Sequence, residues 1–191
     1  GTRFRGGGGT HTGNFTATAT GVLEFNGSTN NLGMGASATG AGTFRFTGGD
    51  IHFNAGSAVA GPLTTELSGA TVAFDTGSTI SLGPVLFSSG TLTGNGTVDI
   101  TGLLRWTGGT MDGAGGVTNA NGGMLLDGGG EVRVTQRRLN TSGTTTWTSG
   151  YIYVDSGAQI NNTGTWDVTA DGYALSTPWW YGGTALFSNA G

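Results

Sequence analysis

The chain has 191 residues, of which 41 are glycine, and only 9% are charged, against about a quarter in ordinary soluble domains. It contains no lysine and its net charge is -4, so the sequence offers no basic patch for binding nucleic acid. It has no cysteine and no apolar run near the roughly 20 residues that a membrane span needs, which excludes disulfides, thiolate metal sites and a membrane-spanning helix.

A bulky apolar residue returns about every 20 residues along the whole chain. A period of this length with internal similarity is typical of a solenoid, in which each turn of chain, or rung, packs only on its neighbours. We therefore expect residues 1–191 to form one array of about ten rungs. The marker residues of these rungs are Phe4, Phe25, Phe46, Leu67, Phe87, Trp106, Leu126, Trp147, Trp166 and Phe187.

The pattern within a rung predicts three short strands separated by glycine corners. In residues 44–53 an alternating strand precedes Gly48 and Gly49, and a second alternating strand follows them. Alternation at period two indicates one buried face, and glycine supplies the positive φ of a tight corner. A third strand recurs around Val59, Ile80, Ile100, Leu139 and Ile160.

These features predict an all-β fold, a right-handed parallel β-solenoid (β-helix) with three short strands per rung. A globular β-sandwich with many short strands is the competing fold, but it does not require a marker every 20 residues over ten cycles.

A charged residue precedes the marker in each of the first four rungs. These residues are Arg3, Glu24, Arg45 and Glu66, which alternate in sign. Opposite charges on neighbouring strands contribute about 0.2–1 kcal/mol each, so the series predicts a ladder that fixes the register of the rungs. The alternation of charge could also arise by chance. A structure that places Arg45 out of reach of both Glu24 and Glu66 would exclude the ladder.

The sequence predicts no catalytic, cofactor-binding or metal-binding residue, and we expect the protein not to be an enzyme. His11 and His52 are the only histidines, and neither belongs to a serine–carboxylate constellation. Asp127 and Asp167 are expected in one column but two rungs apart, about 10 Å at the backbone. We therefore interpret Asp127 and Asp167 as solvated carboxylates at turns rather than as a pair of catalytic acids. The glycine–aspartate stretches lack the consecutive repetition of a calcium-binding array, although adventitious calcium at a turn stays open.

Trp179, Trp180 and Tyr181 form the most unusual local cluster, directly after Pro178. Clustered aromatic side chains can stack on sugars or anchor a protein interface. They can also plug the end of a hydrophobic core. Both interpretations stay open at this stage.

Several motifs resemble the repeats of large bacterial cell-surface or secreted β-solenoid proteins, including adhesin-like and autotransporter-passenger-like regions. They are Phe/Trp-Thr-Gly-Gly at 46–49 and 106–109, Gly-Thr-Leu-Thr-Gly-Asn-Gly-Thr at 90–97 and Ile-Asn-Asn-Thr-Gly-Thr-Trp at 160–166. The likeness covers mainly residues 85–191. It implies an extracellular or cell-surface location, a structural or adhesive role and no cofactor.

The first and last residues, 1–4 and 187–191, lie in the marker pattern with no capping sequence. Open strand edges pair readily, so we expect either a longer chain or subunits stacked head to tail. The expected function is that of a structural extracellular protein, a β-solenoid subunit or segment of a filament, stalk or sheath, whose partner is itself or an adjacent domain. The alternative is an adhesin or glycan-binding module, and the third is a carbohydrate-active β-helix enzyme.

Overall fold

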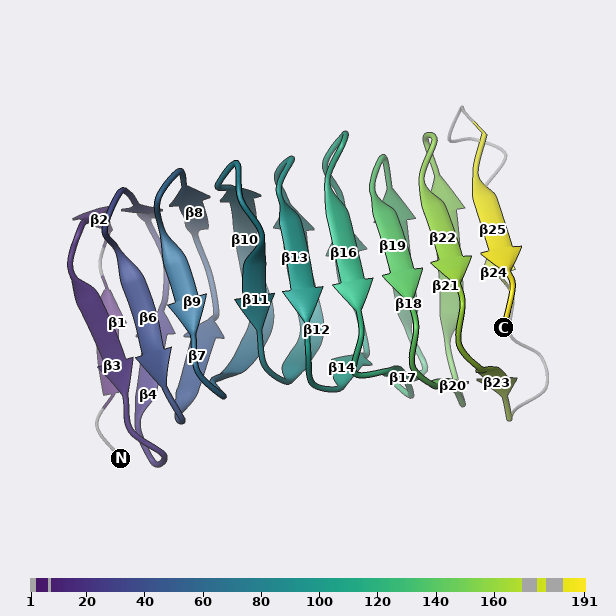
Figure 1. Cartoon of the computed structure of the whole chain (residues 1–191), viewed down its shortest axis with the longest axis horizontal. Coiled ribbons are helices and arrows are strands. Elements are labelled where there is room, and N and C mark those ends of the chain that lie inside the picture. Colours follow the sequence, from purple (N-terminus) through teal and green to yellow (C-terminus); the bar gives the residue numbers. More distant parts are fainter. Residues whose placement is uncertain (1–2, 7, 170–174, 178–183) are drawn as a thin grey trace.

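The computed structural model describes residues 3–6, 8–169, 175–177 and 184–191, which form 25 strands. Among the described residues every strand pair is parallel, and successive pairs join residues about one rung apart. The described chain contains no helix, so it has no helix able to cross a membrane. The expected all-β parallel β-solenoid is confirmed, and the β-sandwich is excluded (Figure 1).

The first two strands of each rung belong to one 16-stranded sheet. Its first strands are β1 (Arg3–Gly6), β4 (Val22–Phe25), β7 (Thr43–Phe46), β10 (Thr64–Asp75), β12 (Val85–Thr93), β14 (Leu104–Trp106), β17 (Met124–Leu126), β20 (Thr145–Trp147) and β23 (Trp166–Val168). Its second strands are β2 (Gly9–His11), β5 (Thr29–Leu32), β8 (Asp50–Asn54), β15 (Gly109–Met111), β18 (Glu131–Thr135), β21 (Tyr151–Asp155) and β24 (Leu175–Ser176). The long β10 and β12 supply both strands of their rungs, because they run on through the glycine corner.

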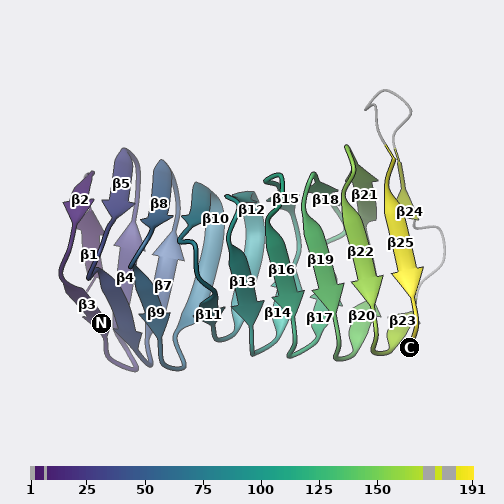
Figure 2. The same cartoon turned by 45° about the horizontal axis from the view of Figure 1, so that its top comes forward.

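The third strands form two smaller sheets that follow one another along the solenoid. The three-stranded sheet contains β3 (Asn14–Ala17), β6 (Ser37–Gly40) and β9 (Ala58–Ala60). The six-stranded sheet contains β11 (Ile80–Leu82), β13 (Thr97–Ile100), β16 (Val117–Ala120), β19 (Arg138–Thr141), β22 (Gln159–Asn162) and β25 (Leu186–Asn189). Figure 2 shows the six-stranded sheet as a row of parallel strands along one side.

The solenoid is right-handed, as expected. In Figure 1 the near strands β13, β16 and β19 run downward, the distant strands β8 and β10 run upward, and the chain advances from left to right. A path that goes down in front and up behind while moving to the right is a right-handed coil.

Marker residues in the middle of the chain form a buried column. Phe25 pairs with Phe46, which pairs with Leu67, and Phe87 pairs with Trp106. All of these side chains are at most 1% exposed. Burying a large apolar side chain contributes about 1.5–3 kcal/mol, so this column supplies much of the stabilisation of each rung.

Both ends depart from the expected register by two residues. Phe4 lies opposite Leu23 rather than Phe25, and Trp166 lies opposite Thr145 rather than Trp147. A shift of two residues leaves the same side chains facing inward, because side chains alternate with period two. The apolar pattern therefore could not reveal it.

The expected ten rungs are also wrong, because the tenth marker lies in another sheet. Phe187 pairs with Ile160 in the six-stranded sheet and lies 27 residues after it in the chain. The preceding step in the same sheet, from Leu139 to Ile160, is only 21 residues. One long final rung thus contains two markers. The first strands number nine, which corresponds to about eight turns from β1 to β23.

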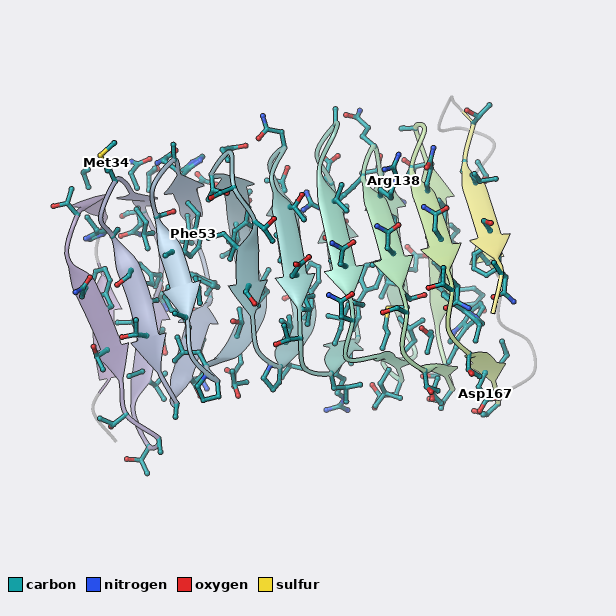
Figure 3. The ribbon with its side chains drawn as sticks, in the orientation of Figure 1. Met34, Phe53, Arg138 and Asp167 are labelled. Carbon is teal, nitrogen blue, oxygen red and sulfur yellow. The ribbon has the colours of Figure 1, made fainter. Side chains whose placement is uncertain are left out.

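The glycine corner explains how β10 and β12 stack so closely. Gly90 has φ of +92°, and a Cβ there would collide with the backbone carbonyl of Ala70 in the rung before. Both conditions exclude any other residue. The core of the two rungs before this corner is aromatic, and Phe53, labelled in Figure 3, stacks 4.8 Å from Phe74.

Candidate functional site

Arg45 lies between two glutamates on neighbouring rungs. Its Nε donates to an Oε2 of Glu66 at 2.5 Å, and its Nη1 lies 3.7 Å from Oε2 of Glu24. The Glu24 side chain is only 4% exposed. Hydrogen bonding to Glu66, followed by the charges of both glutamates, raises the pKa of Arg45 despite its partial burial. The ion pairs join three rungs, and whether they fix the register stays a prediction.

The first member of the predicted ladder, Arg3, lies in a different column. The backbone register places Arg3 opposite Val22 and Arg5 opposite Glu24. The two-residue shift at β1 is the reason. The alternating column is therefore Arg5, Glu24, Arg45 and Glu66.

Asp127 and Asp167 do not share the column that the spacing predicted. Asp167 lies opposite Thr146, which lies opposite Leu125, two positions before Asp127. Asp127 instead accepts from Nε of Arg105 at 3.0 Å. Figure 3 shows Asp167 at the lower edge of the solenoid. The described residues contain no group of three or more histidine, cysteine or acidic residues placed to hold a metal ion.

The two histidines occupy unlike positions. His11 lies opposite Leu32, its Nε2 is 3.1 Å from Oδ1 of Asn30, and its ring packs edge-on against Phe15 and Phe25. His52 lies in the middle of β8 and is half-buried, between the fully buried Ile51 and Phe53 on its strand. Packing and hydrogen bonding account for His11 without a catalytic role.

The least expected residue is Arg137, which is 1% exposed. It lies between β18 and β19, at the corner of the seventh rung, and its guanidinium extends back toward the two preceding rungs. All three of its nitrogens donate hydrogen bonds of 2.8–3.2 Å. The acceptors are Oγ1 of Thr118 and the backbone carbonyls of Gly94, Gly96, Asp112 and Val117.

Small residues at the neighbouring corners make room for this arginine. The positions that match Arg137 on the rungs before and after it are Gly116 and Ala158, as the backbone bonds from Arg138 to Gly116 and from Gln159 to Arg137 show. A Cβ at Gly116 would collide with Nη1 of Arg137. The arginine therefore depends on a glycine one rung earlier.

Arg137 stays charged at neutral pH. Burial lowers its pKa to about 10, while Asp112 and Asp75 oppose that shift. A desolvated charge is costly unless its hydrogen bonds are satisfied, and here each nitrogen has a partner. The charge is therefore tolerated, and it links three rungs through one side chain.

A ladder of side-chain amides runs along the outer face of the six-stranded sheet. Asn161 donates to Asn140 at 3.0 Å, Asn140 to Asn119 at 2.7 Å, and Asn119 to Asp99 at 2.6 Å. All the donors point the same way, and the series ends on a carboxylate, which is the strongest acceptor available. We name Asp99, Asn119, Asn140 and Asn161 the outer amide ladder.

A second, inward ladder lies at the end of the same sheet. Thr141 donates to Oδ1 of Asn162 at 2.7 Å, and Nδ2 of Asn162 donates to Oδ1 of Asn189 at 2.6 Å. Thr141 and Asn162 are each 1% exposed, so polar pairing replaces apolar packing inside the last rungs.

Aromatic and charged side chains meet on the outer side of β18 and β21. The guanidinium of Arg133 lies 5.7 Å from the ring centroid of Tyr153, a cation–π distance, and 3.9 Å from Oδ2 of Asp155. Partial burial and the neighbouring Glu131 raise the pKa of Tyr153. Tyr151, on the same strand, is 40% exposed.

The last rung exposes several large apolar side chains on its three strands. They are Val168, Leu175, Leu186 and Phe187, which are 37–51% exposed. Trp166 packs edge-on against Phe187 at 5.0 Å. Trp179, Trp180 and Tyr181, the predicted aromatic cluster, lie outside the described residues.

Comparisons of this chain with protein-family models, with curated proteins and with solved structures give no match. The solenoid fold therefore rests on the structure alone.

Sequence reasoning missed Arg137 and both amide ladders. A signal for Arg137 was present, since aligning the corners puts it in a series of small residues with Ala36, Ser57, Gly116 and Ala158. The asparagines of the outer ladder, spaced 21 residues apart, also carried a signal, but their direction of donation depends on the stacking itself.

Proposed function

We propose that this protein is a structural extracellular β-solenoid, a subunit or segment of a surface filament, stalk or sheath. The observation that carries the proposal is the set of polar links between rungs, above all the three rungs joined by Arg137. Such links resist shear between neighbouring rungs. A molecule whose role is mechanical gains from them, whereas an enzyme needs a convergent site.

The exposed last rung supports end-to-end contact. Its strands β23, β24 and β25 are the final members of their sheet paths among the described residues, and they carry Val168, Leu175, Leu186 and Phe187. Open strand edges with apolar side chains pair with further strands. A following rung, from the same chain or from a second molecule, would cover them.

Electron microscopy of the purified chain, together with sedimentation velocity over a range of concentrations, tests the proposal. We expect rods that lengthen into fibres, with an axial repeat of about 45 Å, because neighbouring strands lie 4.7–4.9 Å apart. Isolated particles of constant length at every concentration would reject self-assembly.

Adhesion through glycan binding is the second candidate function. It is favoured by a shallow polar groove of about 230 Å³ at the corner of the sixth to eighth rungs, beside the outer amide ladder. A polar surface with side-chain amides and an arginine suits sugar hydroxyls and carboxylates. The resemblance to bacterial surface repeats supports the same extracellular setting. A glycan array tests this candidate, and an array without any reproducible hit would remove it.

A further inference from the structure

We propose that the corner groove of the sixth to eighth rungs binds a carboxylate-bearing sugar of an acidic glycan. This inference deepens the second candidate function and is independent of filament formation. The groove is lined by Gly115, Gly116, Val117, Gln136, Arg137, Arg138, Gly157 and Gln159.

The groove exists because one corner differs from its neighbours. Gln136 has φ of +57°, and glycine occupies the same left-handed position one rung before and one rung after, at Gly115 and Gly157. A Cβ at either glycine would meet nothing within 4 Å. The Gln136 side chain therefore stands between two open spaces.

Arg138 supplies the charge that would recognise an anion. It is exposed, lies near the top of β19 in Figure 3, and donates from Nε to Oε1 of Gln159 at 3.3 Å. Its Nη groups have no hydrogen-bond partner among the residues that the structure describes. A guanidinium held by one bond with free Nη donors suits a planar carboxylate.

The electrostatic surroundings favour an anion although the whole chain is acidic. No carboxylate lines the groove, and the charged guanidinium of Arg137 lies at its base. Arg137 does not contact the ligand in this proposal, because its nitrogens already donate inside the protein. Its role is to add positive potential.

The outer amide ladder makes a sugar a better ligand than a free anion. Asn140 lies two residues after Arg138 on the same face, about 7 Å away, and Asn161 stands in the same relation to Gln159. Each ladder amide uses one N–H for the ladder and keeps a second for a ligand. A glycan running along β19 and β22 would place its carboxylate at Arg138 and its hydroxyls at the asparagines.

Calorimetry at low salt, with an oligogalacturonate hexamer and its methyl-esterified form, tests the proposal on the whole chain. We expect the acid to bind and the ester, which has the same sugars without the charge, to bind at least tenfold more weakly. R138M should weaken binding of the acid at least tenfold. Q136G should weaken it severalfold, and it should fold normally because glycine fits a left-handed corner.

R105M is the matched control, because Arg105 is also exposed but lies on β14 in the other sheet. It should leave binding unchanged. Equal binding of acid and ester, or no effect of R138M in a folded variant, would overturn the proposal. So would the absence of binding at millimolar ligand. Free galacturonate or sulfate binding as tightly as the hexamer would show a small-anion site and overturn the glycan assignment.

Discussion

At the scale of single residues, Arg137 shows how one side chain can join rungs that are far apart in the sequence. Its acceptors lie between 19 and 43 residues earlier in the chain. Other corners have alanine, serine or glycine at this position. The small residues on the neighbouring rungs leave the space that the arginine side chain fills. The charge is buried where backbone carbonyls, rather than carboxylates, surround it.

R137M should lower the free energy of unfolding by about 2–4 kcal/mol, because it keeps most of the volume but leaves four carbonyls and one hydroxyl without their donor. Chemical denaturation followed by circular dichroism measures this. R138M, one residue later on the exposed side, is the control and should change stability by less than about 0.5 kcal/mol. Equal effects of the two variants would show that the internal bonds contribute little.

R45M should destabilise the protein by about 1–2 kcal/mol, since it removes the cation that lies between the carboxylates of Glu24 and Glu66 on the rungs to either side, and Glu24 is nearly buried. The loss should shrink at high salt, because salt screens the repulsion. Thermal melts at low and high salt measure it. R105M removes a more exposed ion pair with Asp127 and should lower the stability less than R45M does, because water screens exposed pairs. A larger loss for R105M than for R45M would contradict the ladder.

At the scale of elements, side-chain hydrogen bonds hold β13, β16, β19 and β22 of the six-stranded sheet in register. The outer amide ladder points from β22 through β19 and β16 to β13, and it ends on Asp99. A one-residue slip of β16 or β19 would turn its asparagine inward and break two bonds. The ladder therefore specifies register as well as adding stability.

N140D should destabilise the chain by about 1 kcal/mol at pH 7, because a carboxylate at this position can accept from Asn161 but cannot donate to Asn119. At pH 4 or below the protonated acid can donate again, so the difference in unfolding free energy between N140D and the native chain should become smaller. Unfolding at the two pH values measures this. N121D, at an exposed residue outside the ladder, should show no such narrowing.

Tyr153 offers a second titration. Partial burial and the charge of Glu131 raise the pKa of its phenol above the ordinary value of 10.0. The native state therefore holds this proton more tightly than the unfolded state, and the associated stability is present below pH 10 and lost as the pH rises through the raised pKa. Difference absorbance between the native chain and Y153F should show a phenol that ionises later than a model tyrosine. An ordinary midpoint would contradict the environment described for β21.

At the scale of the whole molecule, the solenoid is a rod whose sides and ends differ. Along its length the strands are paired and their side chains are linked. The last described rung, in contrast, exposes Val168, Leu175, Leu186 and Phe187. We therefore expect association through this end, because pairing there would extend the core that already exists.

V168K should reduce concentration-dependent association, because it places a charge on the edge strand β23, and charged edges discourage pairing. Leu103, which is 45% exposed at a corner in the middle of the rod, provides the control L103K. Sedimentation velocity of the two variants and the native chain measures the effect. A similar decrease for both variants would indicate nonspecific apolar association rather than contact through the end.

The sequence by itself determined the repeat, the three strands per rung, the inward and outward faces and the glycine corners. All of these follow from local rules, the alternation of side chains and the backbone freedom of glycine, which act within a few residues. That is why the central markers from Phe25 to Trp106 occupy the expected positions.

Only the tertiary structure decided how the rungs register at the two ends, how many there are, and which polar residues meet. A two-residue shift preserves the apolar pattern, so the positions of Arg3 and Trp166 could not be read from it. The longer last rung contains two marker residues, so counting markers overestimated the number of rungs. The partners of Arg137 and the direction of the amide ladder depend on contacts between rungs, and those contacts exist only once the chain has stacked.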